Sequence, residues 1–324
     1  MSPYQPKNFT LTDYRFAGDA DLGLPPYLFC EAAVIAIDVA LATGRPLLVA
    51  GPPGCGKSRL AEAMAALLGW NFRATTMTSH TQLEELTVEV DHLRRLHDAH
   101  CAAIPAPPAG PALPAVALKP DAAYYNPGIF WWAFDRRSAS RRNLSPEDAA
   151  ACLIGLDFPG RERPQANGEE KTVLLIDEID KAEPDLPNDL LEPLDRRSFR
   201  LPDGTTLPAA ADQEVLTVIT TNRERELPKA FLRRCVTLVL PEPDADGLTA
   251  IAKAHEPQAE PTRVRAIADR IVEFRDKADE HGLRPPGTSE FLDAVRTCEK
   301  LRISVDGGDL WRQIEGAVLL KPTI

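Results

Sequence analysis

The sequence lacks the segments that mark membrane and secreted proteins. No apolar run approaches the roughly 18 residues that a bilayer-spanning helix needs. The first residues, MSPYQPKNFTLTDYRF, have no continuous apolar stretch of the kind that a signal peptide requires. The six cysteines lie far apart without a CxxC pair, which argues against a disulfide framework and a cysteine zinc site. We therefore expect a cytoplasmic protein with no membrane partner.

Positive charge is also scarce. The 324 residues carry 37 Lys and Arg against 48 Asp and Glu, a formal net charge of −11. Such a chain lacks the overall positive field that supports non-specific binding to nucleic acid, so we expect no nucleic-acid partner. Proline, in contrast, is abundant at 30 residues, roughly twice its ordinary share of about 5%. Many prolines fall in 101–120, which predicts an exposed linker or arm.

Short apolar runs that end in polar residues alternate with helical patterns in the first three quarters of the chain. This alternation predicts an α/β fold with a parallel sheet, whose ligands bind beyond the carboxyl ends of the strands. After 244 the pattern is helical only. We expect an α/β domain over 1–244, with an inserted arm around 85–165, and a helical domain over 245–324. The predicted strands are 46–51, 71–77, 171–178, 214–222 and 236–243, and the first two helices are predicted at 27–42 and 58–69.

A glycine-rich segment lies between the first of these strands and the helix after it. It matches the phosphate-loop pattern GxxxxGK[ST]. Glycines let successive backbone N–H groups turn towards one phosphate, and the helix N-terminus adds partial positive charge. Lys57 would reach the β and γ phosphates of ATP, and Ser58 would bind Mg²⁺. The matching residues are Gly51, Pro52, Pro53, Gly54, Cys55, Gly56, Lys57 and Ser58.

Two carboxylates follow the apolar run 173–176. Asp177 would hold Mg²⁺ directly or through water, and Glu178 would orient and polarise the attacking water. The pair distinguishes hydrolysis of ATP from simple binding.

Four segments together resemble the AAA+ ATPases, and specifically the MoxR-like members of the dynein-related AAA group, in the helix-2-insert branch. They are GPPGCGKS, VLLIDEIDKAEPDLPNDLLEPLDRRSF, VITTNRERELPKAFLRRC and RPPGTSEFLDAV, and the resemblance spans about residues 25–300. It implies a P-loop αβα sandwich with a central parallel sheet, followed by a small all-helical lid domain. It also implies a ring, commonly a hexamer, that hydrolyses ATP at its subunit interfaces. Such ATPases typically remodel, mature or activate a protein in a chaperone-like way, often beside a partner with a von Willebrand factor A domain.

The resemblance implies further roles. Asn222 matches the first sensor, although an Asn after a strand can also be a turn residue. Arg233 and Arg234 stand where the family places an arginine finger that enters the neighbouring subunit's site; Arg234 is the preferred residue and Arg233 its rival, against the alternative of surface ion pairs. Glu290 stands where a second-sensor Arg is expected, and Arg284 is the possible substitute. Tyr27 and Leu28 are candidates for the adenine pocket.

Three other segments leave alternatives open. The stretch 199–207 predicts a hairpin that either projects towards a ring pore or packs on its own domain. The aromatic segment 124–134 is interpreted as a buried helix rather than a partner contact. A group of histidines and one cysteine suggests a metal site, but its spacing does not place all four on one helix face. That group is His92, His97, His100 and Cys101.

Two other functions compete with the remodelling ATPase. An ATP-gated switch or scaffold in a regulatory or defence assembly is suggested by the altered second sensor. A nucleic-acid motor or restriction subunit is the third possibility, and the net charge of −11 argues against it.

Overall fold

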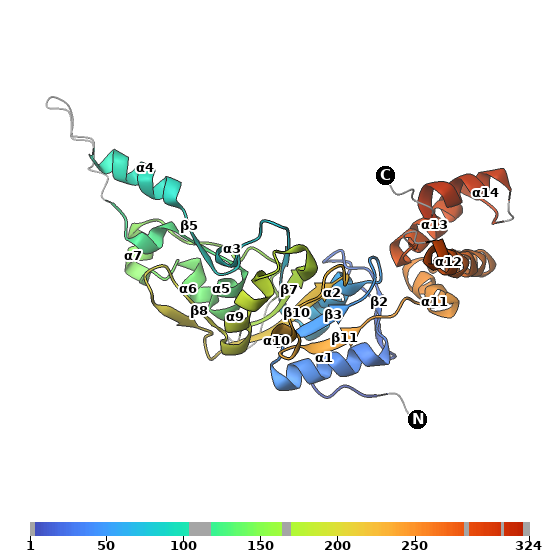
Figure 1. The fold of residues 1–324 in the computed structure, drawn as a ribbon, viewed down its shortest axis with the longest axis horizontal. Helices are drawn as coiled ribbons and strands as arrows, with labels where there is room; N and C mark the ends of the chain where they lie inside the picture. Colours follow the sequence, from blue (N-terminus) through green and yellow to red (C-terminus); the bar gives the residue numbers. More distant parts are fainter. Residues whose placement is uncertain (1–3, 104–117, 164–169, 282–284, 306–307, 320–324) are drawn as a thin grey trace.

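The computed structural model describes residues 4–103, 118–163, 170–281, 285–305 and 308–319. A five-stranded parallel sheet lies at the centre of the larger part (Figure 1), in the strand order β11-β3-β10-β7-β4. The α/β fold predicted from the sequence is therefore confirmed, as are all five strands. Their bounds are β3 (Leu47–Ala50), β4 (Asn71–Thr76), β7 (Glu170–Asp177), β10 (Gln213–Thr221) and β11 (Val236–Val239).

The apolar strands form because helices cover both faces of the sheet. Along β7, Val173 and Leu175 pack on one face with α1 (Glu31–Thr43) and α2 (Lys57–Leu68). Leu174 and Ile176 alternate with them and pack on the opposite face. A parallel sheet buried in this way needs continuous apolar runs, which is the pattern that the sequence shows.

The parallel register brings the carboxyl ends of three strands together. Thr221 at the end of β10 pairs with Ala50 at the end of β3, and Ile219 pairs with Ile176 just before the end of β7. The residues that follow β3, β7 and β10 therefore lie along one edge of the sheet, where ligands of such sheets bind.

The N-terminal segment differs from the predicted helix over 27–42. Tyr27–Leu28 is a short strand, β2, that pairs with β1 (Arg15–Phe16), and the helix begins only at Glu31. The buried carboxylate of Asp38 holds the segment that precedes these strands. It accepts hydrogen bonds from the Tyr4 hydroxyl at 2.5 Å and from the Lys7 backbone N–H at 2.8 Å.

Within the described residues of 85–165, the stretch predicted as an inserted arm, α4 (His92–Ala103) projects from the body (Figure 1), and β5 and β6 pair antiparallel at its base. The other elements of this stretch lie along the body. They are α3 (Leu83–Leu86), β5 (Val88–Val90), η1 (Asp121–Tyr124), β6 (Tyr125–Pro127), α5 (Ile129–Phe134), α6 (Arg136–Ser140) and α7 (Pro146–Ala151). Most of the Pro/Ala-rich stretch 101–120 lies outside the described residues.

The aromatic segment is part of the core, as the sequence predicts. All six residues of α5 are buried, and the helix packs beside β4, β7 and β10. The indole N–H of Trp131 donates to the Ser138 hydroxyl at 3.1 Å, so this buried polar group is satisfied.

The predicted hairpin is present as β8 (Ser198–Arg200) and β9 (Thr206–Pro208). Phe199, Leu201 and Leu207 are buried in the core on the α5 side, and the Phe199 ring lies 6.0 Å from the Trp131 ring. This burial favours the alternative in which the hairpin packs on its own domain. The short elements around it are η3 (Ile179–Lys181), α8 (Leu186–Asp189), α9 (Leu191–Arg196) and α10 (Lys229–Leu232).

The last part of the chain is helical. It packs around its own apolar cluster, which includes Ile267, Ile271, Phe291 and Val295. From Ala245 onwards the described residues contain no strand. Within the described ranges, no helix is long and apolar enough to cross a membrane. The elements are α11 (Ala245–His255), α12 (Pro261–His281), α13 (Thr288–Leu301), α14 (Asp309–Ile314) and the π-helical turn η4 (Glu315–Leu319).

Candidate functional site

The glycine-rich loop joins β3 to α2 at the carboxyl edge of the sheet. Gly54 and Gly56 have φ angles of 80° and 94°, a region that L side chains rarely adopt. A Cβ on Gly56 would lie 3.2 Å from the Tyr27 ring, and a Cβ on Gly54 would lie 3.4 Å from the Gly287 Cα. Backbone conformation therefore favours glycine at both positions, and the Tyr27 ring leaves little room for a side chain at Gly56. The loop lies between the N-terminal segment and the helical part of the chain.

Lys57 is held inside this loop. Its ammonium donates to the Gly51 and Pro52 carbonyl oxygens, each at 2.8 Å, and the residue is only 6% exposed. An ammonium has three N–H donors, so one remains for a phosphate oxygen. The position at the start of α2 adds the partial positive charge of the helix N-terminus.

Ser58 and Asp177 lie side by side. The Ser58 hydroxyl lies 2.9 Å from each carboxylate oxygen of Asp177, although the residues are 119 positions apart in the chain. The Thr220 hydroxyl also donates to Asp177. Hydroxyl and carboxylate oxygens are the hard ligands that Mg²⁺ prefers, so this donor set fits Mg²⁺.

Glu178 has a left-handed backbone, with φ 59° and ψ 51°. Its N–H donates to the Thr220 hydroxyl at 2.8 Å, which ties it to β10. Its carboxylate accepts from the Asn222 side-chain amide at 3.3 Å and from the Lys181 ammonium at 2.6 Å. The hydrogen bond to Glu178 is the main reason that the pKa of Lys181 is raised. Glu178, which is predicted to polarise the attacking water, and Asn222, the predicted first sensor, are therefore in direct contact.

Asp180 was not singled out in the sequence, yet it fixes the loop that carries Asn222. Its buried carboxylate accepts the backbone N–H of Asn222 at 3.1 Å and that of Glu224 at 3.0 Å. The only hint in the sequence is its place two residues after Glu178. That position alone does not separate Asp180 from an ordinary surface acid.

The two candidate arginine fingers have different surroundings. Arg234 forms an ion pair with Asp195 and donates to the Ala230 carbonyl at 3.0 Å. Arg233 is exposed, and its side chain has no hydrogen-bond or ion-pair partner in the described part of the chain. The Arg45 guanidinium donates to the backbone carbonyls of both residues, at 3.1 Å for Arg234. Arg45, another residue missed in the sequence, thus holds the segment that presents the pair.

The helical part meets the phosphate loop through the backbone at Gly287. A Cβ on this glycine would lie 3.1 Å from the Pro53 carbonyl oxygen and 3.3 Å from the Gly54 Cα. Glu290 caps the start of α13 by accepting the Gly287 N–H at 3.1 Å, and its carboxylate lies 3.8 Å from the Cβ position of Gly54. A negative charge therefore faces the loop here. Arg284, the predicted substitute for a second sensor, lies outside the described residues.

Arg275 on α12 binds the segment that makes this contact with the phosphate loop. It is 7% exposed, and its guanidinium donates to the Pro286 carbonyl at 2.9 Å and to the Pro243 carbonyl at 2.6 Å. Glu242 forms an ion pair with it at 3.1 Å. Burial lowers the pKa of Arg275, and the charge of Glu242 opposes that effect. The contacts join the connector after β11 to the segment that touches the phosphate loop.

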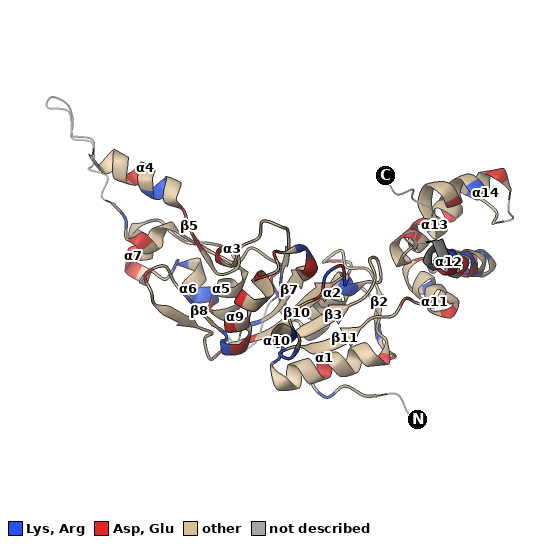
Figure 2. Cartoon of the chain, in the orientation of Figure 1, with Lys and Arg blue, Asp and Glu red and all other residues tan. Residues whose placement is uncertain are grey.

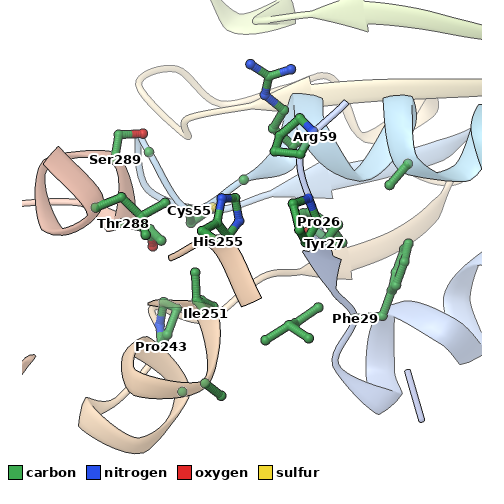
Figure 3. Close-up of a pocket in the computed structure, with 18 of the residues that line it drawn as sticks. Pro26, Tyr27, Phe29, Cys55, Arg59, Pro243, Ile251, His255, Thr288 and Ser289 are labelled. Atoms are coloured by element: carbon green, nitrogen blue, oxygen red, sulfur yellow. The ribbon is translucent and has the colours of Figure 1, made fainter. Parts of the chain in front are cut away.

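A cavity of about 530 Å³ opens beside the phosphate loop, between the N-terminal segment and the helical part (Figure 3). Tyr27 and Leu28, the candidates for the adenine pocket, both line it, as do Cys55, His255 and Thr288. Burial and the nearby charge of Arg296 lower the pKa of His255. The lining is mostly apolar with a few polar groups, as expected of a site for a flat organic ring.

Comparison with known proteins agrees with this geometry. The family model of the AAA domain, dynein-related subfamily, matches residues 46–102 and 137–235, a little under half of the chain. No curated protein matches the chain. The family match and the sheet support an α/β P-loop AAA+ fold and an ATPase of the AAA+ class. This class binds nucleotide, usually with Mg²⁺, and its members commonly form rings.

Proposed function

We propose that this protein is a MoxR-like AAA+ ATPase that hydrolyses ATP in a ring, with a hexamer as the expected assembly, to remodel or activate a protein partner. One observation carries the proposal. The loop with Lys57 and Ser58, the carboxylates Asp177 and Glu178, and Asn222 come from three separate segments and meet at one edge of the sheet. This is the set needed to bind and hydrolyse a nucleoside triphosphate.

The phosphates would bind over the loop 51–58, where the third N–H of Lys57 and the N-terminus of α2 meet them. The base would enter the cavity beside Tyr27 and Leu28. When bound, Mg²⁺ would be held by Ser58 and Asp177 and would neutralise charge on the phosphate oxygens.

Glu178 would orient the attacking water and accept its proton. The carboxylate has two neighbours that set its direction, the Asn222 amide and the Lys181 ammonium. Release from Lys181 would free one oxygen of Glu178 for the water. Asn222 would then fix the other oxygen and contact the terminal phosphate, as the first sensor of this class does.

A second copy would complete the site with an arginine. Arg233 is the better finger on geometric grounds, because Arg234 is already engaged by Asp195 while Arg233 is exposed. A guanidinium delivered in trans offsets the charge that develops on the transferred phosphoryl group.

The acidic surface favours protein as the partner, and a protein with a von Willebrand factor A domain is the partner that the resemblance suggests. The same charge disfavours the nucleic-acid motor. An ATP-gated switch in a regulatory or defence assembly is the second candidate. The observation that favours it is Glu290, which turns a negative charge towards the phosphate loop. A slow turnover, well below about 1 s⁻¹ with the partner present, would distinguish the switch from the remodelling ATPase.

Glu178→Gln tests hydrolysis. The amide keeps the shape of the side chain but cannot accept a proton, so turnover should fall by about 10²-fold or more while the Kd for ATP stays within about threefold. Phosphate release and calorimetric titration measure the two quantities. Glu226→Gln, an exposed acid on the loop after β10, is the matched control and should behave as wild type. Undiminished hydrolysis by Glu178→Gln would reject the assignment.

A mixing experiment tests the trans arginine. Arg233→Ala should lose most turnover, and addition of an equal amount of Lys57→Ala chains should restore part of it. In the mixed ring, the Lys57→Ala copy supplies the arginine to an Arg233→Ala copy that still binds ATP. If only Arg234→Ala chains are rescued in this way, Arg234 is the finger. If neither variant is rescued at any ratio, the trans assignment fails.

A further inference from the structure

Arg45 lies at the edge of the sheet that is opposite the phosphate loop. It comes two residues before β3, whereas the loop follows the carboxyl end of that strand. A strand rises about 3.3 Å per residue, so the stretch from Arg45 to Gly51 spans about 20 Å. Arg45 is therefore too distant to contact ATP bound to the loop of its own chain.

The start of β11 lies beside the start of β3. Val236 pairs in register with Leu47, and the Val236 N–H donates to the Pro46 carbonyl at 2.8 Å. Since the two strands are parallel, the residues just before β11 are at the same amino edge of the sheet. Those residues include Arg233 and Arg234, the candidate arginine fingers. The pair is thus also at the edge opposite the phosphate loop of its own chain.

Two hydrogen bonds tie Arg45 to the backbone of this pair. Its Nε donates to the Arg234 carbonyl oxygen at 3.1 Å, and its Nη2 donates to the Arg233 carbonyl oxygen. One guanidinium, with its rigid fork of donors, thus contacts two successive carbonyls. The bonds fix the backbone at the point where the two arginine side chains leave it.

The other hydrogen bonds of this segment are local. The Arg233 N–H donates to the Lys229 carbonyl at 3.1 Å, and the Arg234 N–H donates to the Phe231 carbonyl at 3.0 Å. These two bonds shape the turn at the end of α10. The bonds from Arg45, in contrast, join that turn to the residues that begin β3.

The side chain of Arg233 is left free by these contacts. Arg233 is exposed and has no side-chain partner among the residues that the structure describes, while Arg234 is paired with Asp195. A fixed backbone limits the directions that a free side chain can take, which is what a residue that enters a neighbouring site needs. Figure 2 shows positive residues around α10, and positive charge at this edge suits the phosphates of a nucleotide.

We infer that Arg45 is a positioning residue for the arginine finger and acts on the ATP site of the neighbouring copy rather than on that of its own chain. The inference rests on the ring and the trans arginine of the proposed function, and it adds the residue that sets the direction of that arginine. Loss of Arg45 leaves the two carbonyls to water and lets the segment 233–234 move. The finger then meets the transferred phosphoryl group less accurately, while ATP binding by the altered chain is unaffected.

Arg45→Ala tests the positioning. Turnover should fall by about tenfold or more, because a small displacement of a positioned group costs a large factor in rate, while the Kd for ATP stays within about twofold of wild type. Arg45→Lys can form one of the two bonds and should recover part of the turnover. Phosphate release and calorimetric titration measure the two quantities. Arg312→Ala is the matched control, since this side chain is 72% exposed, has only a surface ion pair and should behave as wild type when removed.

Mixed rings show which ATP site Arg45 serves. Lys57→Ala chains keep Arg45 and should restore part of the turnover of Arg45→Ala chains, because they supply a well-placed finger to a copy that still binds ATP. Chains that carry both Lys57→Ala and Arg45→Ala should not restore it. A purely structural role of Arg45 would make both kinds of added chain equally ineffective, since the receiving chain would itself be damaged.

Unchanged turnover of Arg45→Ala, a loss of ATP affinity that matches its loss of turnover, or an equal effect of the two kinds of added chain would each overturn the inference. These outcomes leave the proposed function intact as long as Arg233→Ala or Arg234→Ala chains are rescued by Lys57→Ala chains. If neither is rescued, the trans arginine of the proposed function fails, and the role of Arg45 fails with it.

Discussion

The candidate nucleotide site around the phosphate loop has two sides, which we call the sheet wall and the helical wall, and they are built by different means. On the sheet wall, hydrogen bonds fix the polar side chains. Ser58 bonds to Asp177, Asn222 bonds to Glu178, and Lys57 bonds to the loop carbonyls. The helical wall meets the loop with backbone atoms at Gly287 and with the carboxylate of Glu290. We therefore expect the chemistry on the sheet wall and control of access on the helical wall.

Among changes that test the contrast between the two walls, Lys57→Ala on the sheet wall should have the largest effect on ATP binding and turnover. Loss of the ammonium removes a charge-assisted contact to phosphate, so the affinity for ATP should fall by about 100-fold and turnover should vanish. Calorimetric titration with ATP checks it. Lys253→Ala, an exposed lysine on α11, is the control. Binding that remains within tenfold of wild type would mean that the sheet wall does not dominate phosphate binding.

A smaller effect on the same wall is expected from Asp180→Asn. The amide accepts less strongly from the N–H groups of Asn222 and Glu224, and its own NH₂ group enters a buried site. Turnover should fall by about tenfold with little change in KM, because the loop that carries Asn222 is displaced. The free energy of unfolding should fall by about 1–3 kcal/mol.

Denaturant titration and steady-state kinetics measure these two changes. Asp185→Asn, an exposed acid on the segment before α8, should leave both quantities unchanged. A loss of stability without a loss of turnover would assign Asp180 a structural role only.

The smallest effect is expected on the helical wall, from Glu290→Gln. The amide removes a negative charge that faces the phosphate loop, so ATP should bind about threefold to fivefold more tightly. The gain should shrink at high salt, because screening weakens the repulsion in the wild type. Asp276→Asn on α12 is the control for a general change of charge. Weaker binding by Glu290→Gln would show that the carboxylate supports the site, and the contrast between the two walls would fail.

The sheet wall could be predicted from the sequence because each of its groups lies at the end of a strand. The loop 51–58 and the pair Asp177 and Glu178 are local patterns, and a parallel sheet brings such ends together whatever the details of packing. The core position of α5 followed in the same way from six consecutive residues that are nearly all large and apolar.

The residues that the sequence did not reveal contact partners elsewhere in the chain. Arg45 contacts the carbonyls of Arg233 and Arg234 from nearly 190 positions away, and Arg275 reaches the carbonyls of Pro243 and Pro286. Every residue has a backbone carbonyl oxygen, so no pattern in the sequence marks particular carbonyls as partners. The side of α4 that contacts its own chain was also not predicted, because an amphipathic pattern does not say which side of a helix its own chain will cover.

The close approach of Gly54 and Gly287 links the position of the phosphate loop to the orientation of α13. The helix begins at the next residue, Thr288, and its 14 residues extend for about 21 Å. A tilt of about 10° at the glycine contact would move the far end of the helix by about 4 Å, for a helix of that length. A Cβ on Gly54 would lie 3.4 Å from the Gly287 Cα, and a Cβ on Gly287 would lie 3.3 Å from the Gly54 Cα, so the two backbones are close neighbours. A displacement of the phosphate loop that tilts α13 would therefore be largest at Leu301, the far end of the helix.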